Sequence, residues 1–483
     1  MRFNLKLHAS FLGLLWIING LLMLACLPVA WYYAEDTVMA LAAAATITVA
    51  IGAAARSYGR GGTKDLRRRD GFLIVTLGWL SMSLFGCLPF LLSGAIADPT
   101  DAWFETVSGF TTTGATILND IEVLPKSILF WRSLTHWIGG MGIIVLAIAI
   151  LPLLGIGGTE LFAAEASGLS TDKLHPRITG TAKRLWFVYV LLTGIEMVLL
   201  YLGGMGVYDA VNHSMSTIST GGFSTKNTSL ADATPYIQYV VTVFMMVGGT
   251  NFALLYLLFK GRPGRLFRNE EFRTYALIFG LATVLVTLTV LWVTDTGLEK
   301  AFRHAVFQVA AIMTTTGFTT ADYTAWTPFL SLVFLLLMFV SACAGSTAGG
   351  LKIVRHVVLF KNTFLEIKRQ LYRSAVFPLR MNGRTVPSNV ISNVLAFFVA
   401  YMMVFAIGTV VLAFLGLDTE SAIGGVAACL SNVGPGLGSV GPSSSYAEVH
   451  DAGKWVLSVL MLLGRLELFT ILVILTPHFW RRI

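Results

Sequence analysis

Hydrophobic residues in this chain gather in long uninterrupted runs instead of alternating with polar ones. Runs of about 20 residues are long enough to cross a bilayer as helices. Because hydrocarbon offers the backbone no hydrogen-bond partner, only helices and closed barrels span it, and unbroken runs favour helices. The pattern therefore predicts an all-α membrane protein with about ten spanning helices. These are expected at residues 10–33, 37–55, 71–93, 128–154, 184–203, 235–259, 274–294, 329–360, 390–415 and 454–480.

Short semi-apolar segments interrupt the loops on one side of the predicted membrane. They occupy residues 103–114, 211–222, 301–317 and 421–434, and each ends in hydroxyl or amide residues and glycine. Each is too short to cross a bilayer and fits a re-entrant half-helix. The repetition predicts two leading helices followed by four helix/pore-loop/helix repeats in a pseudo-fourfold arrangement. The expected units are residues 1–70 for the leading helices, then 71–160, 161–265, 266–385 (with a broken second helix) and 386–483.

Charged residues are few and unevenly placed. They make up 12% of the chain against 55% hydrophobic residues, with a net charge of +8. Lys and Arg concentrate in alternate loops at residues 56–69, 173–184, 260–273 and 352–384, whereas the intervening loops are acidic. Basic loops face the cytoplasm, so both termini are expected inside. Membrane orientation explains this charge better than a nucleic-acid surface does, and we expect no nucleic-acid partner.

Several isolated residues receive only structural interpretations. Cys26, Cys87, Cys343 and Cys429 lie in or beside apolar runs without a CxxC pair, which predicts core residues instead of metal ligands or disulfides. His136, Arg132 and Lys352 flank predicted spans. We expect no role for them beyond snorkelling or local pairing.

The four half-helices end in a shared pattern of hydroxyl or amide residues followed by glycine. An extended backbone with glycine at its turn can aim carbonyl oxygens at one axis and replace the hydration shell of a monovalent cation. A single copy would be explained as well by a turn or by tight helix packing. Four copies on one side of the membrane favour an ion-selectivity filter. Its candidate residues are Thr112, Thr113, Gly114, Thr220, Gly221, Gly222, Thr315, Thr316, Gly317, Asn432, Val433 and Gly434.

The predicted span at 329–360 is interrupted by a run of small residues. Each glycine in a helix interior costs about 1 kcal/mol, so this run is expected to break the helix. Its residues are Gly345, Ser346, Thr347, Ala348, Gly349 and Gly350. A broken backbone at membrane depth must be buried or must line a watery cavity. The segment is therefore expected to be either a tight helix-packing surface or a mobile loop that gates a pore.

A single arginine, Arg465, lies near the middle of the last predicted span. A charge at that depth costs about 2.5–3.5 kcal/mol on insertion scales and should face protein or water. Glu467 is two residues away and does not share its helix face. An interhelical salt bridge, for example with Glu196, is one explanation.

The motifs TTTGATI, STGGFS, TTTGFTT and SNVGPGLG, with the repeat order and length, resemble the Trk/Ktr/HKT superfamily of cation transporters, and within it the bacterial TrkH/TrkG potassium-uptake subunits. The resemblance covers nearly the whole chain. Glycine at all four aligned positions is similar to potassium-preferring members. The resemblance implies potassium as substrate, bound by Thr112, Thr113, Thr220, Gly221, Thr315, Thr316, Asn432 and Val433.

The resemblance also implies a gate and partners. It places Arg465 in the pore beside the glycine-rich segment, which would act as the gate. It implies a homodimer in the bacterial inner membrane and a cytosolic nucleotide-binding regulatory subunit of the TrkA type. No covalently bound cofactor is expected.

Other classes of function fit the sequence less well. We find no phosphate loop, HExxH motif or nucleophile elbow, so an enzyme is not expected. A voltage sensor would need arginine at every third helix position. An alternating-access carrier would need two broken helices in corresponding halves, and only one predicted helix is clearly interrupted. Coupling of transport to protons or sodium stays open.

Overall fold

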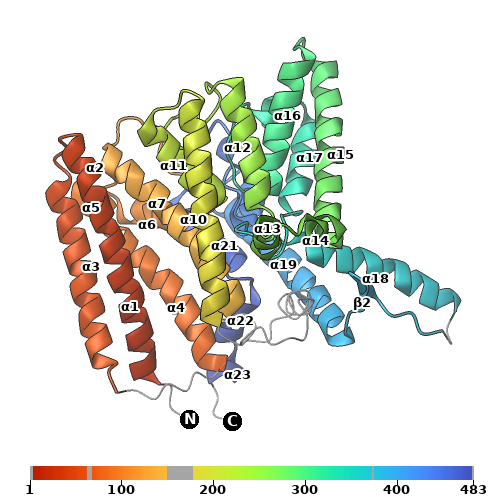
Figure 1. Cartoon of the computed structure of the whole chain (residues 1–483), viewed down its shortest axis with the longest axis horizontal. Coiled ribbons are helices and arrows are strands. Elements are labelled where there is room, and N and C mark those ends of the chain that lie inside the picture. Colours follow the sequence, from red (N-terminus) through yellow and green to blue (C-terminus); the bar gives the residue numbers. More distant parts are fainter. Residues whose placement is uncertain (1–3, 62–67, 150–177, 373–374, 481–483) are drawn as a thin grey trace.

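The structure, a computed structural model, describes residues 4–61, 68–149, 178–372 and 375–480. It is built almost entirely of helices, as the hydropathy pattern predicts (Figure 1). Four of the sequence predictions involve positions outside these residues: Lys64 and Arg67 of the first basic loop, Lys173 of the second, the end of the 128–154 span, and the 160/161 unit boundary.

Two leading helices form one edge of the molecule (Figure 1). They are α1 (Leu5–Met23), continued by η1 (Leu24–Cys26) and α2 (Leu27–Tyr32), and α3 (Val38–Tyr58). Small residues let their backbones meet, because a β-carbon on Gly13 would lie 2.6 Å from the carbonyl oxygen of Gly52. A β-carbon on Gly52 would lie 2.9 Å from the oxygen of Gly13. Close glycine contact of this kind is typical of membrane helix pairs.

The rest of the chain repeats one order of elements: a long helix, a short helix, a loop and a further helix. The elements are α4 (Arg68–Gly86), α5 (Leu88–Ser93), α6 (Pro99–Phe110) and α7 (Lys126–Ala149); α10 (Ile178–Leu202), α11 (Val207–Ile218), α12 (Pro235–Gly248), α13 (Phe252–Phe259) and α14 (Pro263–Arg268); α15 (Glu270–Val293), α16 (Leu298–Met313), η2 (Tyr323–Ala325), α17 (Pro328–Met338), α18 (Ile353–Leu371), β1 (Arg380–Met381) and β2 (Arg384–Thr385); and α19 (Ser388–Phe414), α20 (Thr419–Ser431), η3 (Gly438–Val440), α21 (Asp451–Arg465), α22 (Phe469–Leu475) and α23 (Pro477–Trp480).

Short helices α6 and α20 begin at aspartate caps. The Asp98 side chain accepts hydrogen bonds from the backbone N–H groups of Thr100 and Asp101, and Asp418 accepts one from Ser421. Hydrogen bonds from Ser421 hold the pKa of Asp418 below its usual range. A carboxylate at this position also complements the positive end of the helix dipole. Helices α11 and α16 follow glycine instead, at Gly206 and Gly297.

The expectation of a single interrupted helix is wrong, because three predicted spans are broken. Helices α12 and α13 meet at 108°, and α21 and α22 at 117°. The first break is stabilised by Asn251, whose side chain caps α13 at the N–H groups of Ala253 and Leu254. At the second, the backbone is left-handed at Glu467 and Leu468. Neither break contains proline, so the apolar pattern of the sequence predicts a continuous helix across each of them.

The described residues contain six helices long and apolar enough to span a membrane, or eight if each bent pair is one span. The predicted 329–360 span is not one helix: α17 ends at Met338, and α18 starts at Ile353. Helix α18 projects away from the body on the side opposite α1 and α3 (Figure 1). Side chains of α6, α7, α20 and α21, including Phe104, Trp131, Val426 and Leu457, share one buried core.

Candidate functional site

The four segments that follow α6, α11, α16 and α20 adopt the same turn. The backbone is left-handed at the second residue, with φ of 52° at Thr112, 54° at Thr220, 56° at Thr315 and 57° at Asn432. It is left-handed again two residues later, with φ of 81° at Gly114, 83° at Gly222, 75° at Gly317 and 97° at Gly434. Non-glycine residues adopt this conformation at a cost of about 1–2 kcal/mol, so its repetition at three threonines and an asparagine marks a constrained site. The repeated turn aligns Gly222, and not Gly221, with the other glycines.

The four glycines contact the neighbouring segments in cyclic order. A β-carbon on Gly114 would lie 2.2 Å from the Gly221 carbonyl oxygen, one on Gly222 1.9 Å from that of Thr316, one on Gly317 2.0 Å from that of Val433, and one on Gly434 2.5 Å from that of Thr113. Each glycine therefore faces the carbonyl of the residue that precedes the next glycine, and the fourth segment returns to the first. Only glycine fits at these four positions.

Hydroxyl groups fix the backbone of the segments. The Thr111 and Thr113 hydroxyl oxygens lie 2.7 Å apart, and those of Thr314 and Thr316 lie 2.7 Å apart in the third segment. In the fourth segment, Asn432 donates through Nδ2 to the Thr113 hydroxyl at 2.9 Å and to the Met461 carbonyl at 2.9 Å. The amide of Asn432 thus links the last segment to the first.

A cavity of about 190 Å³ opens on one side of the four glycines. All four glycines line it, together with residues that follow them, among them Thr116, Ser224, Thr319 and Pro435. Lys226 and Arg132 also reach its wall. In the described residues, no cluster of three or more His, Cys, Asp or Glu side chains is placed to hold a metal ion. The polar surface here is thus mainly backbone, hydroxyl and amide, which suits a weakly held monovalent cation.

A buried ion pair supports the first two segments. Arg132 of α7, 2% exposed, donates through Nε to Glu105 of α6 at 2.6 Å. Its Nη1 donates to the Ser224 carbonyl at 3.0 Å, and its guanidinium lies 3.4 Å from the Phe223 ring centroid. The His136 ring also stacks on the Phe223 ring, with 3.9 Å between the two centroids. The expectation that Arg132 and His136 only snorkel or pair locally is wrong, because both are buried between segments distant in sequence.

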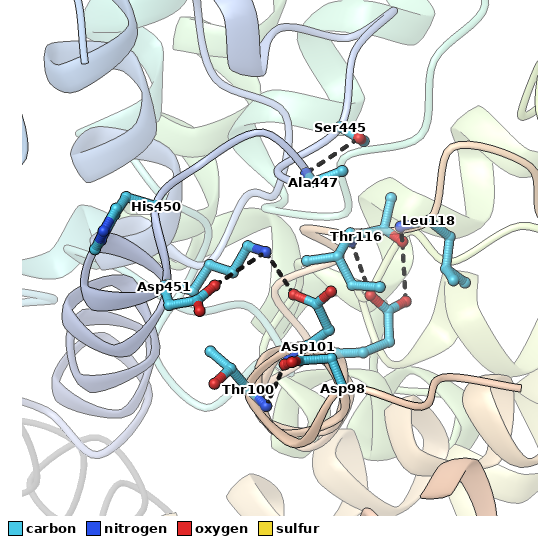
Figure 2. A network of polar contacts seen from close by, with 12 residues as sticks. Asp98, Thr100, Asp101, Thr116, Leu118, Ser445, Ala447, His450 and Asp451 are labelled. Carbon is cyan, nitrogen blue, oxygen red and sulfur yellow. Dashed lines mark hydrogen bonds and ion pairs between the residues drawn. The ribbon is translucent and has the colours of Figure 1, made fainter. Parts of the chain in front are cut away.

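A second ion pair joins α6 to α21 near the start of α6. Figure 2 shows Asp98 and Asp101 of α6 lying near Asp451 of α21. Lys454 Nζ lies 2.5 Å from an Asp101 carboxylate oxygen and 3.7 Å from Asp451. Glu105, one turn further along α6, accepts hydrogen bonds from Thr116 Oγ1 and the Ile117 N–H, both at 3.0 Å. These contacts join the first segment to α6, and α6 to α21.

The glycine-rich segment 344–350 is a buried loop that contacts three of the four segments. Thr347 donates its hydroxyl to the carbonyls of Ile218 at 2.9 Å and Gly248 at 3.1 Å. The Gly349 N–H donates to the Thr315 hydroxyl at 2.9 Å, and a β-carbon on Gly349 would lie 2.5 Å from Asn432. The broken backbone therefore lies against the ends of α11, α16 and α20, where buried polar partners satisfy it.

Arg465 lies at the end of α21, at the bend, and not in the middle of a straight span. Its side chain is 1% exposed, and it donates to the carbonyls of Thr347 at 2.6 Å and Gly139 at 3.0 Å. It forms no salt bridge with Glu196, whose carboxylate oxygens lack a hydrogen-bond partner within the described part of the chain. Glu467 instead pairs with Arg355 at 2.5 Å. The salt-bridge explanation of Arg465 is therefore wrong.

Lys352 is also buried, at 7% exposed, and its ammonium donates to the Ala348 carbonyl in the loop. This contact, four residues away along the chain, is the local pairing expected for Lys352 from the sequence. The sequence patterns assigned no role to Glu105 or Glu271. Glu105 is a single carboxylate in the second half of α6, and such a charge is the signal that could have identified it, whereas Glu271 lies within the charged run 268–273.

Comparison with known proteins gives a consistent result. Residues 37–481 match the family model TrkH, described as a cation transport protein. The chain is 40% identical to the Trk system potassium uptake protein TrkH of Halomonas elongata, over 99% of this chain and 100% of that protein. It is 42% identical to the TrkH protein of Escherichia coli K12, over 86% and 87%. The crystal structure of the potassium transporter TrkH from Vibrio parahaemolyticus superposes with a TM-score of 0.92 at 39% identity, covering 99% of this chain and 100% of that one.

Proposed function

This chain belongs to the TrkH family of cation transport proteins, and we propose that it takes up potassium through a pore formed within one polypeptide. It is a multi-pass membrane protein, as its apolar helices indicate. Its relatives are named potassium uptake proteins and not enzymes. The proposed pore consists of the four repeats at residues 71–160, 161–265, 266–385 and 386–483, which follow the leading unit 1–70.

The closed order of contacts among Gly114, Gly222, Gly317 and Gly434 carries this proposal. We propose that the four similar turns, whose contacts close a ring, direct their backbone carbonyl groups toward a common axis. Such carbonyls can replace the water around a potassium ion. The proposed ion-binding positions are Thr112, Thr113, Thr220, Gly221, Thr315, Thr316, Asn432 and Val433.

The proposed gate is the loop 345–350 together with Arg465. The loop lies against three of the four filter segments through Thr347 and Gly349. Arg465 donates to the loop carbonyl of Thr347, which keeps a fixed positive charge next to the proposed ion path. A positive charge in a poorly solvated passage raises the energy of a cation there, so the loop and the arginine together oppose conduction.

Several features of the assembly also belong to this proposal. We propose that both termini lie in the cytoplasm, that the protein forms a homodimer in the bacterial inner membrane, and that a TrkA-type nucleotide-binding subunit docks on its basic inner loops. The exposed helix α14, with Arg265 and Arg268 in its last turn, supplies part of that basic surface.

Coupled symport is the second candidate function, favoured by the three broken helices. Discontinuous helices are typical of secondary transporters, in which half-helix ends contact the substrate and the coupling ion. The breaks at residues 249–251, 339–352 and 466–468 all lie in the second helices of their repeats. A channel and a proton- or sodium-coupled symporter therefore differ in energetics and not in the location of the filter.

Ion flux into liposomes that contain the purified protein tests both functions. We expect potassium to enter down its gradient, with sodium entering more slowly. Uphill potassium accumulation driven by an imposed proton or sodium gradient would identify symport, and its absence would identify a channel. If potassium crosses no faster than in protein-free liposomes under every gradient, the proposed function is wrong.

A further inference from the structure

We infer that Glu271 holds the loop 344–350 in its closed position by joining the two ends of that loop. This inference rests on the proposal that the loop is the gate, and it adds the residue that keeps the gate shut. Glu271 lies in the first turn of α15 and is 1% exposed. It is distant in sequence from the loop, and no motif connects the two.

Two backbone hydrogen bonds join the residues that precede the loop to those that follow it. The Ser341 N–H donates to the Leu351 carbonyl and the Ile353 N–H donates to the Ala342 carbonyl, both at 3.2 Å. These bonds close the base of the loop. They leave two N–H groups, those of Ala344 and Val354, on either side of the base without a backbone acceptor there.

A single oxygen of Glu271 accepts from both of these N–H groups. The Ala344 N–H donates to Oε1 at 2.6 Å, and the Val354 N–H donates to the same atom at 3.2 Å. Val354 lies in the first turn of α18, so its N–H is one that the helix leaves unpaired. Because a buried N–H without an acceptor is costly, release of the loop from Glu271 requires both groups to find new partners.

The position of Glu271 connects the loop to the basic surface of the protein. Helix α14 ends at Arg268, and Asn269 caps α15 by accepting from the Phe272 N–H. Glu270, the neighbour of Glu271, pairs with Lys361 of α18. A displacement of α14 is therefore transmitted within three residues to the carboxylate that closes the loop. Glu271 is a positioning residue, since it contacts the loop and not the proposed ion path.

The test uses three substitutions that separate charge from reach. E271Q keeps an oxygen at the same distance and removes the charge. E271D keeps the charge but is one methylene shorter, so it cannot reach both N–H groups. E271A removes the acceptor. E270Q is the matched control, because it removes a charge from the same helix turn and weakens the pair with Lys361 of α18 without removing a contact to the loop.

Exposure of Cys343 measures loop release directly, because its side chain is 1% exposed and it precedes Ala344. In full-length protein with Cys26, Cys87 and Cys429 changed to alanine, we expect a soluble maleimide to modify Cys343 slowly. We expect E271A and E271D to raise this rate at least about tenfold, since the loss of one such hydrogen bond shifts an opening equilibrium by that factor. E271Q and E270Q should stay within about twofold of the unsubstituted protein.

Unchanged labelling in both E271A and E271D would overturn the inference, as would labelling of E271Q equal to that of E271A. If E271A does not fold, which gel filtration would reveal, the comparison of E271D with E271Q carries the test. Potassium flux in the same variants separates the two proposals. Faster labelling with unchanged flux supports the role of Glu271 and counts against the loop as the gate, whereas faster labelling with faster basal flux supports both.

Discussion

Gly114 lies in a left-handed turn whose space is filled by the backbone of the next segment. A β-carbon there would be 2.2 Å from the Gly221 carbonyl oxygen, far inside contact distance. Gly94 has a similar backbone, with φ of 72°, but no atom lies within 4 Å of its would-be β-carbon. The two positions therefore separate the effect of backbone strain from the effect of steric contact.

We predict that G114S lowers the potassium-to-sodium preference in liposome flux, because the serine side chain displaces a carbonyl from the proposed filter. G94S should cost about 1–2 kcal/mol of stability through its backbone and leave the preference unchanged. Equal preference in G114S and in the unsubstituted protein would remove this glycine from the filter.

Arg465 has two carbonyl partners and no acidic one among the residues that the structure describes. Its charge is therefore not neutralised by a carboxylate. At an effective dielectric constant near 20, a unit charge about 4 Å from a cation is worth about 4 kcal/mol. Beside the proposed ion path, a charge of this size would slow cation passage.

We predict that R465A conducts potassium faster than the unsubstituted protein, by on the order of tenfold or more. R465K should lie between them, because a single ammonium keeps the charge but does not span both carbonyls. Flux in proteoliposomes and thermal stability in detergent would be measured together. E196Q is the control, and it should change neither flux nor thermal stability greatly. If R465A is unstable and does not conduct potassium, and if adding E196Q restores both properties, the salt-bridge explanation is right.

At the scale of elements, the loop 344–350 is held by hydrogen bonds to several other elements, and the Thr347 hydroxyl makes two of them. Its hydroxyl lies 2.9 Å from the Ile218 carbonyl and 3.1 Å from the Gly248 carbonyl. These contacts join the loop to the end of α11 and to the break after α12. The stability of the closed loop therefore depends on elements from another repeat.

Removal of residues 347 and 348 should raise basal potassium flux and weaken control by the cytosolic subunit. T347V, which keeps the shape and loses the hydroxyl, should raise basal flux by about fivefold, as expected for about 1 kcal/mol of lost hydrogen bonding. T409V on α19 removes a hydroxyl that bonds only within its own helix and should have no effect. Loss of folding without any leak would favour a packing role for the loop.

At the scale of the whole molecule, the charge pattern sets the expected orientation in the membrane. Gly264 lies on the basic helix α14 and Ala231 in an acidic loop, and both positions are exposed. Both lie outside the predicted hydrocarbon-spanning parts, so cysteines at them should report sidedness without disturbing the core.

We predict that an impermeant thiol reagent added outside intact cells modifies A231C and spares G264C, because basic loops face the cytoplasm. Lysed cells provide the control, in which both variants should react. Labelling of G264C alone in intact cells would invert the orientation and place the proposed filter on the wrong side.

Sequence alone determined the membrane class, most of the helix positions and the family. This follows from the solvent, because lipid forces each span to satisfy its backbone hydrogen bonds within one helix, and length and hydropathy then suffice. The four short segments were also visible, since their glycines recur in register with the helices. The alignment of Gly222 followed from the same spacing, and the assignment of these segments to a filter stays a prediction.

Only the tertiary structure decided the breaks, the pairings and the order of the ring. The bends at residues 249–251 and 466–468 carry no proline. At the first bend, the Phe252 N–H donates to the distant Gly345 carbonyl at 3.0 Å. The partners of Arg132, Arg465 and Glu271 lie far away in sequence. The approach of Asn432 to Thr113, 319 residues apart, is of the same kind. Local patterns report what each helix buries, but the identity of a long-range partner depends on how the helices pack, and that information is absent from any single segment.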